Sequence, residues 1–149
     1  MKVMVMVEGS GADEASFRPT EAMFAAMATY NEALVRAGVM RDGDGLKPSS
    51  AGARVVFEGG RTTVEPGPFA DAEDLIEGYS IWEVDSLEEA IDWAKRCPHD
   101  FDGDARQVLE IRPYATVDDF GDAYTPELRE REQRMAEQLR AQRAAGEPS

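Results

Sequence analysis

Two carboxylates, Asp71 and Glu73, follow the turn-forming run Gly67-Pro68-Phe69 and are separated by one residue. Carboxylates held close together raise one another's pKa, which general acid–base catalysis requires. We therefore regard Asp71 and Glu73 as candidate catalytic residues at the mouth of a pocket. The simpler interpretation is structural, because Gly permits a positive φ, Pro restricts its own φ and Phe packs into a core. Both interpretations stay open.

His99, the only histidine, is a third acid–base candidate. Its unperturbed pKa lies near neutrality, and neighbouring acids would favour the charged form; the alternative is a solvated loop histidine. Its segment also contains Asp100, Asp102 and Asp104, but the glycine falls at the fourth place from Asp100 and not at the sixth, as an EF-hand loop requires. We expect no metal, and no cofactor either, since no phosphate loop or dinucleotide fingerprint occurs.

Cys97 is the only cysteine and directly follows Arg96, whose charge would lower the pKa of the thiol. We favour a different role, in which Cys97 packs as a small apolar side chain at the end of a helix. A single cysteine excludes an internal disulfide, which suits the reducing cytoplasm.

The strands offer a second kind of site, because alternate side chains of a strand point to opposite faces of a sheet. If Val3, Val5 and Val7 pack beneath helices, Met4 and Met6 face the other way. That second face would contain methionine, an aromatic residue and a few polar groups. Such a composition is typical of a ligand pocket and equally of a dimer interface. The candidate ligand-binding residues are Met4, Met6, Tyr30, Gly67, Pro68, Phe69, Trp82 and Arg112.

The elements that must position these residues indicate an α+β fold. Short apolar runs between turn residues predict strands, and apolar spacings of three and four predict helices. Residues 86–89 form a capping-box pattern, and Gly59-Gly60 suits a two-residue hairpin turn. The expected strands are 3–7, a segment from 39 to 48, 54–58, 61–65, 79–84 and 108–112, with helices after Pro19 and Ser86. The order βαβ, hairpin, βαβ is ferredoxin-like with an inserted hairpin.

Residues 116–149 differ in composition from residues 1–115, which predicts one domain followed by a C-terminal extension. Thr125-Pro126 is typical of a helix start, and the helix should run to Arg143. Its apolar edge consists of Leu128, Met135 and Leu139. Because so narrow an edge buries little surface, we expect this helix to dock on a partner subunit or to fray.

The charge balance excludes some classes of partner. The 149 residues contain 30 acidic and 16 basic side chains, giving a net charge of −14. A field of that sign repels nucleic acid and anionic membrane surfaces. No apolar stretch reaches the roughly 18 residues of a membrane span. We therefore expect a cytoplasmic protein that binds neither nucleic acid nor membranes.

Residues 66–74 resemble the Asp-Gly-Pro-Phe-Ala-Glu-Thr-Lys-Glu motif of the DGPF branch of the YCII-related family. Four positions, 67–70, match identically, whereas Pro66, Ala72 and Glu73 depart from the motif. The similarity extends over nearly the whole chain, through residues 32–39, 86–90, 93–98, 110–113 and 124–128.

The resemblance implies a dimeric α/β-barrel, in which two ferredoxin-like sheets face each other and enclose a pocket. It also implies acid–base catalysis by a His-Asp pair in one branch of the family. In this sequence Glu21 occupies the helical position that corresponds to that histidine. Some members of the family are associated with extracytoplasmic-function sigma factors.

Three functions follow from these observations. The first is a small-molecule-binding domain that acts as a homodimer. The second is a cofactor-free enzyme that uses Asp71, Glu73 or His99 for proton transfer on a small organic substrate. The third is an interaction or regulatory accessory linked to a sigma factor, with the C-terminal helix as its contact.

Overall fold

The computed structural model describes residues 1–99, 101 and 106–146. The three aspartates considered above as calcium ligands, Asp100, Asp102 and Asp104, lie outside the described residues. The chain divides into two compact units, Met1–Tyr114 and Ala115–Ser149.

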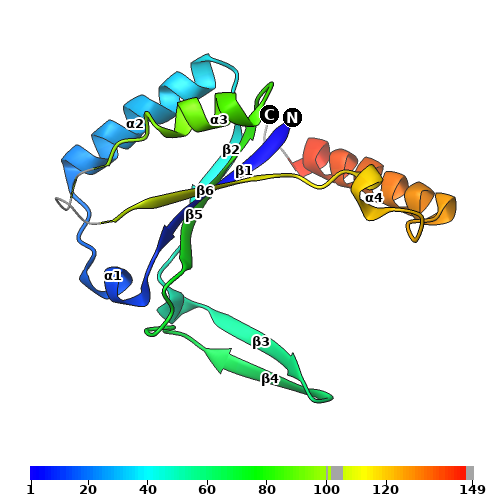
Figure 1. Ribbon diagram of the computed structural model, residues 1–149, viewed down its shortest axis with the longest axis horizontal. Coiled ribbons are helices and arrows are strands. Elements are labelled where there is room, and N and C mark those ends of the chain that lie inside the picture. Colours follow the sequence, from blue (N-terminus) through cyan, green and yellow to red (C-terminus); the bar gives the residue numbers. More distant parts are fainter. Residues whose placement is uncertain (100, 102–105, 147–149) are drawn as a thin grey trace. The chain divides into compact units, whose positions relative to one another are not determined.

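The first unit is built on an antiparallel sheet. Its strands are β1 (Lys2–Gly9), β2 (Met40–Gly45), β5 (Leu75–Glu83) and β6 (Val108–Pro113), in the order β2-β5-β1-β6. Two helices, α2 (Glu21–Arg36) and α3 (Leu87–Ala94), cover the same face of this sheet (Figure 1). The protein is therefore a mixed α+β protein, as expected, and its strand order is consistent with a ferredoxin-like fold.

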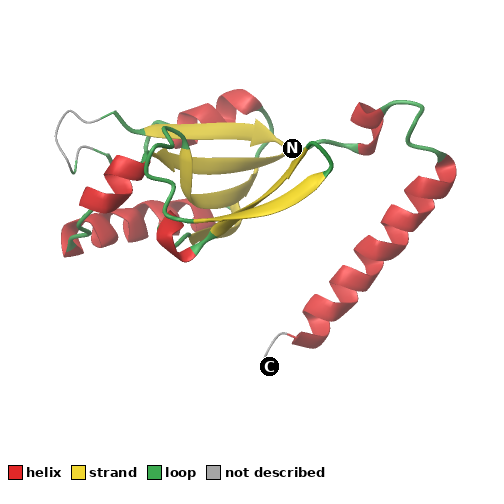
Figure 2. Ribbon diagram, turned by 90° about the horizontal axis from the view of Figure 1, so that it is seen from below, coloured by secondary structure: helices red, strands yellow, loops and turns green. Residues whose placement is uncertain are grey.

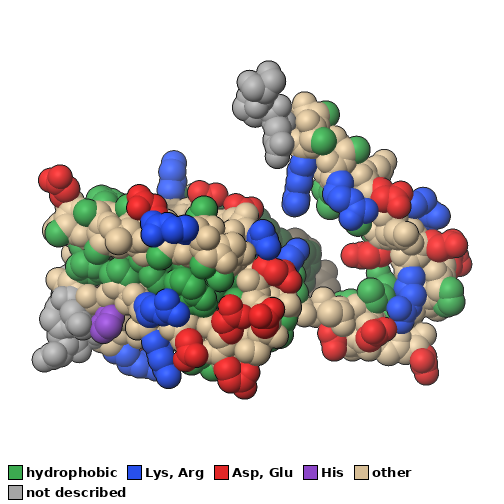
Figure 3. Space-filling view, turned by 90° about the horizontal axis from the view of Figure 1, so that it is seen from above, with side chains coloured by type: hydrophobic (Ala, Val, Ile, Leu, Met, Phe, Trp, Pro, Cys, Tyr) green, Lys and Arg blue, Asp and Glu red, His purple; other side chains and the backbone are tan. Residues whose placement is uncertain are grey.

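The strand register decides which side chains face the helices. Val3 lies opposite Trp82, and Val5 opposite Ile111. Directly opposed side chains share a face, and these four belong to the core or pack against it. The largest fully buried side chains are Trp82, Leu34 and Val3. Viewed from the helix side, hydrophobic side chains form a band across this unit (Figure 3).

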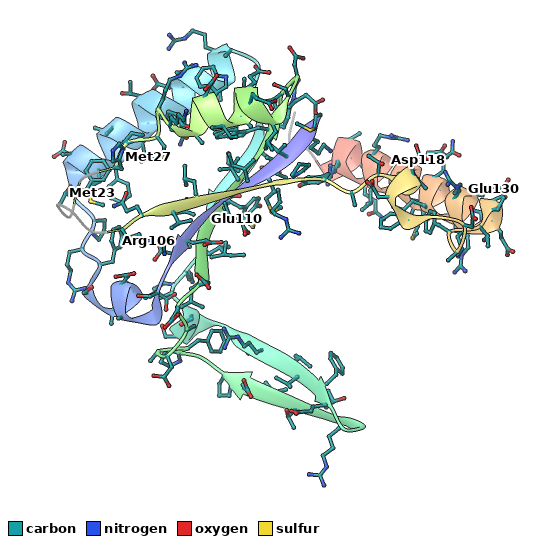
Figure 4. All side chains as sticks on the ribbon, viewed as in Figure 1. Met23, Met27, Arg106, Glu110, Asp118 and Glu130 are labelled. Carbon is teal, nitrogen blue, oxygen red and sulfur yellow. The ribbon has the colours of Figure 1, made fainter. Side chains whose placement is uncertain are left out.

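The opposite face of the sheet is here called the open face. Met4 lies opposite Ile81 and Met6 opposite Tyr79 in this register. Figure 4 shows Met27 on the side of α2 that faces the sheet, and Glu110 on the far side of the sheet. The open face consists of Met4, Met6, Tyr79, Ile81, Glu110 and Arg112.

Local signals explain where the two helices begin. Thr20 caps α2 by accepting a hydrogen bond from the backbone N–H of Met23 (3.2 Å). Ser86 caps α3 by accepting one from the N–H of Glu89 (3.1 Å), as the sequence pattern predicts. The Glu89 carboxylate accepts from the N–H of Asp85 (2.6 Å), one residue before the position that a capping box would use.

Two elements differ from the sequence prediction. Residues 11–16, expected to be a loop, form α1 (Gly11–Ser16), which begins with a reciprocal pair of hydrogen bonds between Ser10 and Asp13. β5 begins at Leu75 and not at residue 79, and its first residue pairs with Gly9 at the end of β1. The acidic run before Leu75 and the glycine at 78 conceal this half of the strand from a search for apolar periodicity.

A second, two-stranded sheet separates β2 from β5 along the chain. It consists of β3 (Ala53–Glu58) and β4 (Arg61–Pro66), paired antiparallel after the short 3₁₀ turn η1 (Ser49–Ala51). Gly59 and Gly60 have φ of 56° and 74°, the positive values that a type I′ turn requires. Figure 2 shows both sheets in yellow, seen from below.

The second unit consists of η2 (Val117–Phe120) and α4 (Pro126–Gly146). At the start of η2 the Asp119 carboxylate accepts hydrogen bonds from the N–H (2.6 Å) and the hydroxyl (3.0 Å) of Thr116. The Tyr124 hydroxyl donates to the Glu132 carboxylate (3.0 Å). α4 has no buried residue, and acidic and basic side chains are interspersed along it (Figure 3).

Candidate functional site

A cleft of about 680 Å³ lies between α2 and the helix-covered face of the sheet. Its walls come mainly from α2, β2 and β5, with two residues from β1, one from β6 and one, Cys97, from the turn after α3. The apolar lining includes Val5, Met27, Leu34, Met40, Trp82 and Leu109. A concave, largely apolar site of this size is suited to a small molecule.

Tyr30 forms part of the same wall but is already engaged. Its hydroxyl donates a hydrogen bond to the backbone carbonyl of Trp93 (2.8 Å), and burial raises the pKa of the phenol. Tyr30 therefore offers a ligand the face of its ring, while its hydroxyl holds α2 against the last turn of α3.

The polar end of the cleft contains Glu14, Lys47 and Glu77. The Glu14 carboxylate accepts two hydrogen bonds from Ser49, one from the backbone N–H (2.8 Å) and one from the hydroxyl (2.6 Å). α1 is thereby joined to the loop after β2, which places a fixed negative charge beside Glu77.

Glu77 is positioned by an irregularity in the sheet. The register between β1 and β5 shifts between Val7 and Glu8, and Glu77 is the extra residue opposite this shift. A bulge of this kind re-aims a side chain. A Cβ atom at Gly9 would collide with the Glu77 carboxyl group, so the missing side chain of Gly9 is what leaves room for it. The Glu77 carbonyl accepts from the N–H of Leu46 (2.8 Å), which ties the bulge to the end of β2.

The surroundings of Glu77 favour its neutral form. Burial raises its pKa, and the negative charges of Asp13 and Glu14 raise it further. Within the part of the chain that the structure describes, no hydrogen bond reaches its side chain. Glu77 therefore holds its proton to a higher pH than an ordinary glutamate does. A cation bound beside it would stabilise the ionised carboxylate and lead it to release the proton. No short motif marks this residue; the only signal is an acid within the run 75–78, between two apolar residues and a glycine.

Cys97 also lines the cleft. Burial raises the pKa of its thiol, so the lowering considered from Arg96 is wrong. The physical reason is desolvation of the thiolate, and the Arg96 guanidinium stacks on the ring of Trp93, 3.9 Å from its centroid. Packing as a small, partly buried side chain is the role that the structure supports.

The three acid–base candidates of the sequence lie elsewhere. Asp71 and Glu73 are exposed in the loop between β4 and β5, and His99 is exposed after α3, with its Nδ1 atom 3.0 Å from the Cys97 carbonyl oxygen. None of the three is among the residues that line the cleft. Their assignment as catalytic residues stays a prediction.

The turn Gly67-Pro68-Phe69 forms a junction at the base of the hairpin. The N–H of Gly67 donates to the Gly52 carbonyl (2.9 Å), and the N–H of Phe69 donates to the Ser49 hydroxyl (3.0 Å). A Cβ atom at residue 67 would collide with the Ser49 carbonyl, so a close backbone approach requires glycine there. The Arg54 guanidinium lies over the Phe69 ring, 3.8 Å from its centroid.

The remaining ligand-binding candidates are divided between the two faces of the sheet. Tyr30 and Trp82 line the cleft, whereas Met4, Met6 and Arg112 belong to the open face. The aromatic residue that accompanies the two methionines is therefore Tyr79 and not Trp82, because Trp82 lies opposite Val3 in the register.

Two further properties bear on function. No group of three or more His, Cys, Asp or Glu side chains in the described ranges is arranged to hold a metal ion. None of the helices described is both long enough and apolar enough to cross a membrane.

Comparison with known proteins identifies the first unit. No curated protein matches the chain. The profile of the YCII-related domain family matches residues 1–114, which is about three quarters of the sequence and nearly coincides with the first compact unit. The chain therefore belongs to the YCII-related domain family.

Proposed function

We propose that this protein binds a small molecule in the cleft between α2 and the sheet, and that the molecule combines an apolar body with a basic amine. The observation that carries the proposal is the position of the Glu77 carboxyl group, which lies with Glu14 and Lys47 at the polar end of a cleft whose remaining lining is mainly apolar.

The two parts of the cleft suit the two parts of such a ligand. Burying an apolar body against Met27, Leu34 and Trp82 contributes roughly 25 cal/mol for each Å² removed from water. An ammonium group beside Glu77 would relieve the repulsion that Asp13 and Glu14 exert on an ionised Glu77. The net charge of −14 also raises the local concentration of cations.

A matched pair of probes tests this proposal. 1-Octylamine and 1-octanol share the same apolar chain and differ in the charged head group. We expect titration calorimetry to show octylamine binding more tightly than octanol by about tenfold, the effect of one partly exposed charge-assisted hydrogen bond. Glu77→Gln should abolish this preference and leave octanol binding unchanged.

Glu32→Gln is the matched control, because Glu32 is exposed on α2 and does not line the cleft. It should keep the preference of the unsubstituted protein. Equal binding of the two probes by the unsubstituted protein would contradict the role of Glu77, and binding of neither would contradict the cleft as a ligand site.

A second candidate function, proton transfer on a bound substrate, is favoured by the raised pKa of Glu77. A carboxyl group that stays protonated nearer neutrality is suited to general acid catalysis. Asp71, Glu73 and His99 remain alternative groups for the same chemistry. Turnover that Glu77→Gln abolishes, and that Asp71→Asn leaves unchanged, would assign the reaction to the cleft.

We also propose that the protein is a homodimer formed through the open face of the sheet. Met4, Met6 and Ile81 give this face an apolar centre, and it lies away from α2 and α3. Met6 is already buried in the single chain, so two such faces packed together would add burial mainly at Met4 and Ile81, which are half-buried. The molar mass from light scattering tests this directly.

A further inference from the structure

One face of the β3–β4 hairpin carries no charge. Three opposed pairs make up this face, here called the hairpin face: Ala53 with Pro66, Val55 with Val64, and Phe57 with Thr62. Its apolar side chains are unusually exposed, with 78% of Phe57, 65% of Val64 and 55% of Val55 accessible to solvent.

Such exposure is costly for a hairpin of this size. A two-stranded sheet is marginally stable at best in water unless a further layer packs on it. The base of the hairpin is secured by the Gly67–Gly52 hydrogen bond and by Arg54 on the Phe69 ring, but both contacts leave the hairpin face uncovered. A contiguous apolar surface of this kind is typical of an interaction site.

The distribution of charge indicates which partner the hairpin face fits. The ionisable groups of the hairpin lie on its other face, with Arg54 opposite Glu65 and Glu58 opposite Arg61. Their charges sum to zero, whereas the whole chain carries −14. A basic partner would be drawn to the acidic surface, but a second copy of this chain is repelled there and meets no such repulsion at the hairpin.

The surface area that a stable dimer must bury also favours a second copy of this chain as the partner. With strands about 4.8 Å apart and a rise of about 3.3 Å per residue, the open face covers about 400 Å² and the hairpin face about 200 Å². Two open faces together bury about 800 Å², less than the roughly 1,200–2,000 Å² of a stable interface. If each hairpin also covers an equal area of the other copy, the total reaches about 1,600 Å².

We propose that the hairpin face docks on a second copy of this chain, so that each protomer of the dimer is held by the hairpin of the other. This inference rests on the homodimer proposed above and adds the element that stabilises it. Phe57 and the pair Val55–Val64 are the residues that the docking buries.

Sedimentation of the full-length chain over a range of concentrations tests the inference. Val55→Ser and Val56→Ser are matched variants, since the two residues are neighbours in β3 on opposite faces of the hairpin. Val55→Ser should raise the dimer dissociation constant by about tenfold or more, and Phe57→Ser by about 100-fold, because each substitution removes apolar burial twice in a symmetric dimer. Val56→Ser should leave the constant close to that of the unsubstituted chain.

The possible results separate this inference from the dimer on which it rests. A monomeric unsubstituted chain overturns both. A dimer that Phe57→Ser does not weaken overturns the docking of the hairpin and leaves the dimer intact. Equal weakening by Val55→Ser and Val56→Ser also overturns it, because the effect then follows from a loosened hairpin and not from one of its faces.

Discussion

Glu77 illustrates how one residue acquires chemistry from its surroundings. A carboxyl group on a solvated strand would have an ordinary pKa. The bulge in β5 turns this one towards the cleft, and burial together with Asp13 and Glu14 raises its pKa. Its protonation is therefore linked to folding, since the folded chain holds the proton more tightly than the unfolded chain does.

The first prediction is the pH dependence of stability that this linkage causes. The contribution of Glu77 is fully present below its ordinary pKa of 4.5 and is lost as the pH rises through the raised value of the folded chain. Glu77→Gln should therefore be more stable relative to the unsubstituted protein at neutral pH than at pH 4.5. Urea unfolding at a series of pH values measures this difference. A difference that does not change with pH would contradict the raised pKa.

The second prediction concerns Cys97. Because burial raises the pKa of its thiol, the reactive thiolate is scarcer at a given pH in the folded chain than in the unfolded chain. A disulfide reagent should modify Cys97 more slowly in buffer than in denaturant, and octylamine in the cleft should slow the reaction further. A rate that octylamine leaves unchanged would show that the amine does not occupy the part of the cleft beside Cys97.

The sequence indicated some residues of the cleft, but it did not indicate which side chains lie beside one another in the folded chain. Tyr30 and Trp82 were among its ligand-binding candidates, and the structure places both in the lining of the cleft, whereas the carboxylates that it singled out, Asp71 and Glu73, do not line it. Glu77 escaped notice because its position depends on a shift in register with β1 and on the missing side chain of Gly9. Gly9 and Glu77 are distant in the sequence, so no local pattern indicates that they come into contact.

The elements follow local signals more closely. The start of α3 is an example, because the Ser86 hydroxyl satisfies an N–H group that would otherwise lack a partner at the first turn. The same helix supplies Ala90 to the core, and the backbone carbonyl of Trp93 in its last turn accepts a hydrogen bond from the Tyr30 hydroxyl.

The third prediction tests this cap. Ser86→Ala removes the acceptor of the Glu89 N–H and should lower the free energy of unfolding by about 1 kcal/mol. Ser86→Thr keeps a hydroxyl acceptor and should recover most of that loss. Thermal unfolding followed by circular dichroism compares the three chains. Equal stability of Ser86→Ala and the unsubstituted chain would show that the cap contributes nothing.

Periodicity and caps predicted the core strands, the helices α2 and α3 and the α+β class, because these features depend on neighbouring residues. They did not predict α1, whose six residues contain too few apolar positions for a helical period. They also did not predict the first half of β5, which pairs with the end of β1 through the bulge. Both differences occur beside Glu77, where local preference gives way to tertiary contacts.

On the scale of the whole molecule, ligand binding and association with a second copy are proposed for different surfaces. The helix-covered face contains the cleft, and the open face and the hairpin face are proposed for a second copy of the chain. The net charge of −14 disfavours association except where charge is absent or balanced, and it favours cationic ligands.

The methionines of the first unit report where a ligand binds. Met27 and Met40 line the cleft, whereas Met4 and Met6 lie on the open face. A titration of octylamine into protein with ¹³C-labelled methionine methyl groups distinguishes these two places in one spectrum. We predict that the signals of Met27 and Met40 move and saturate, while those of Met4 and Met6 stay in place. Movement of Met4 and Met6 without Met27 and Met40 would contradict it.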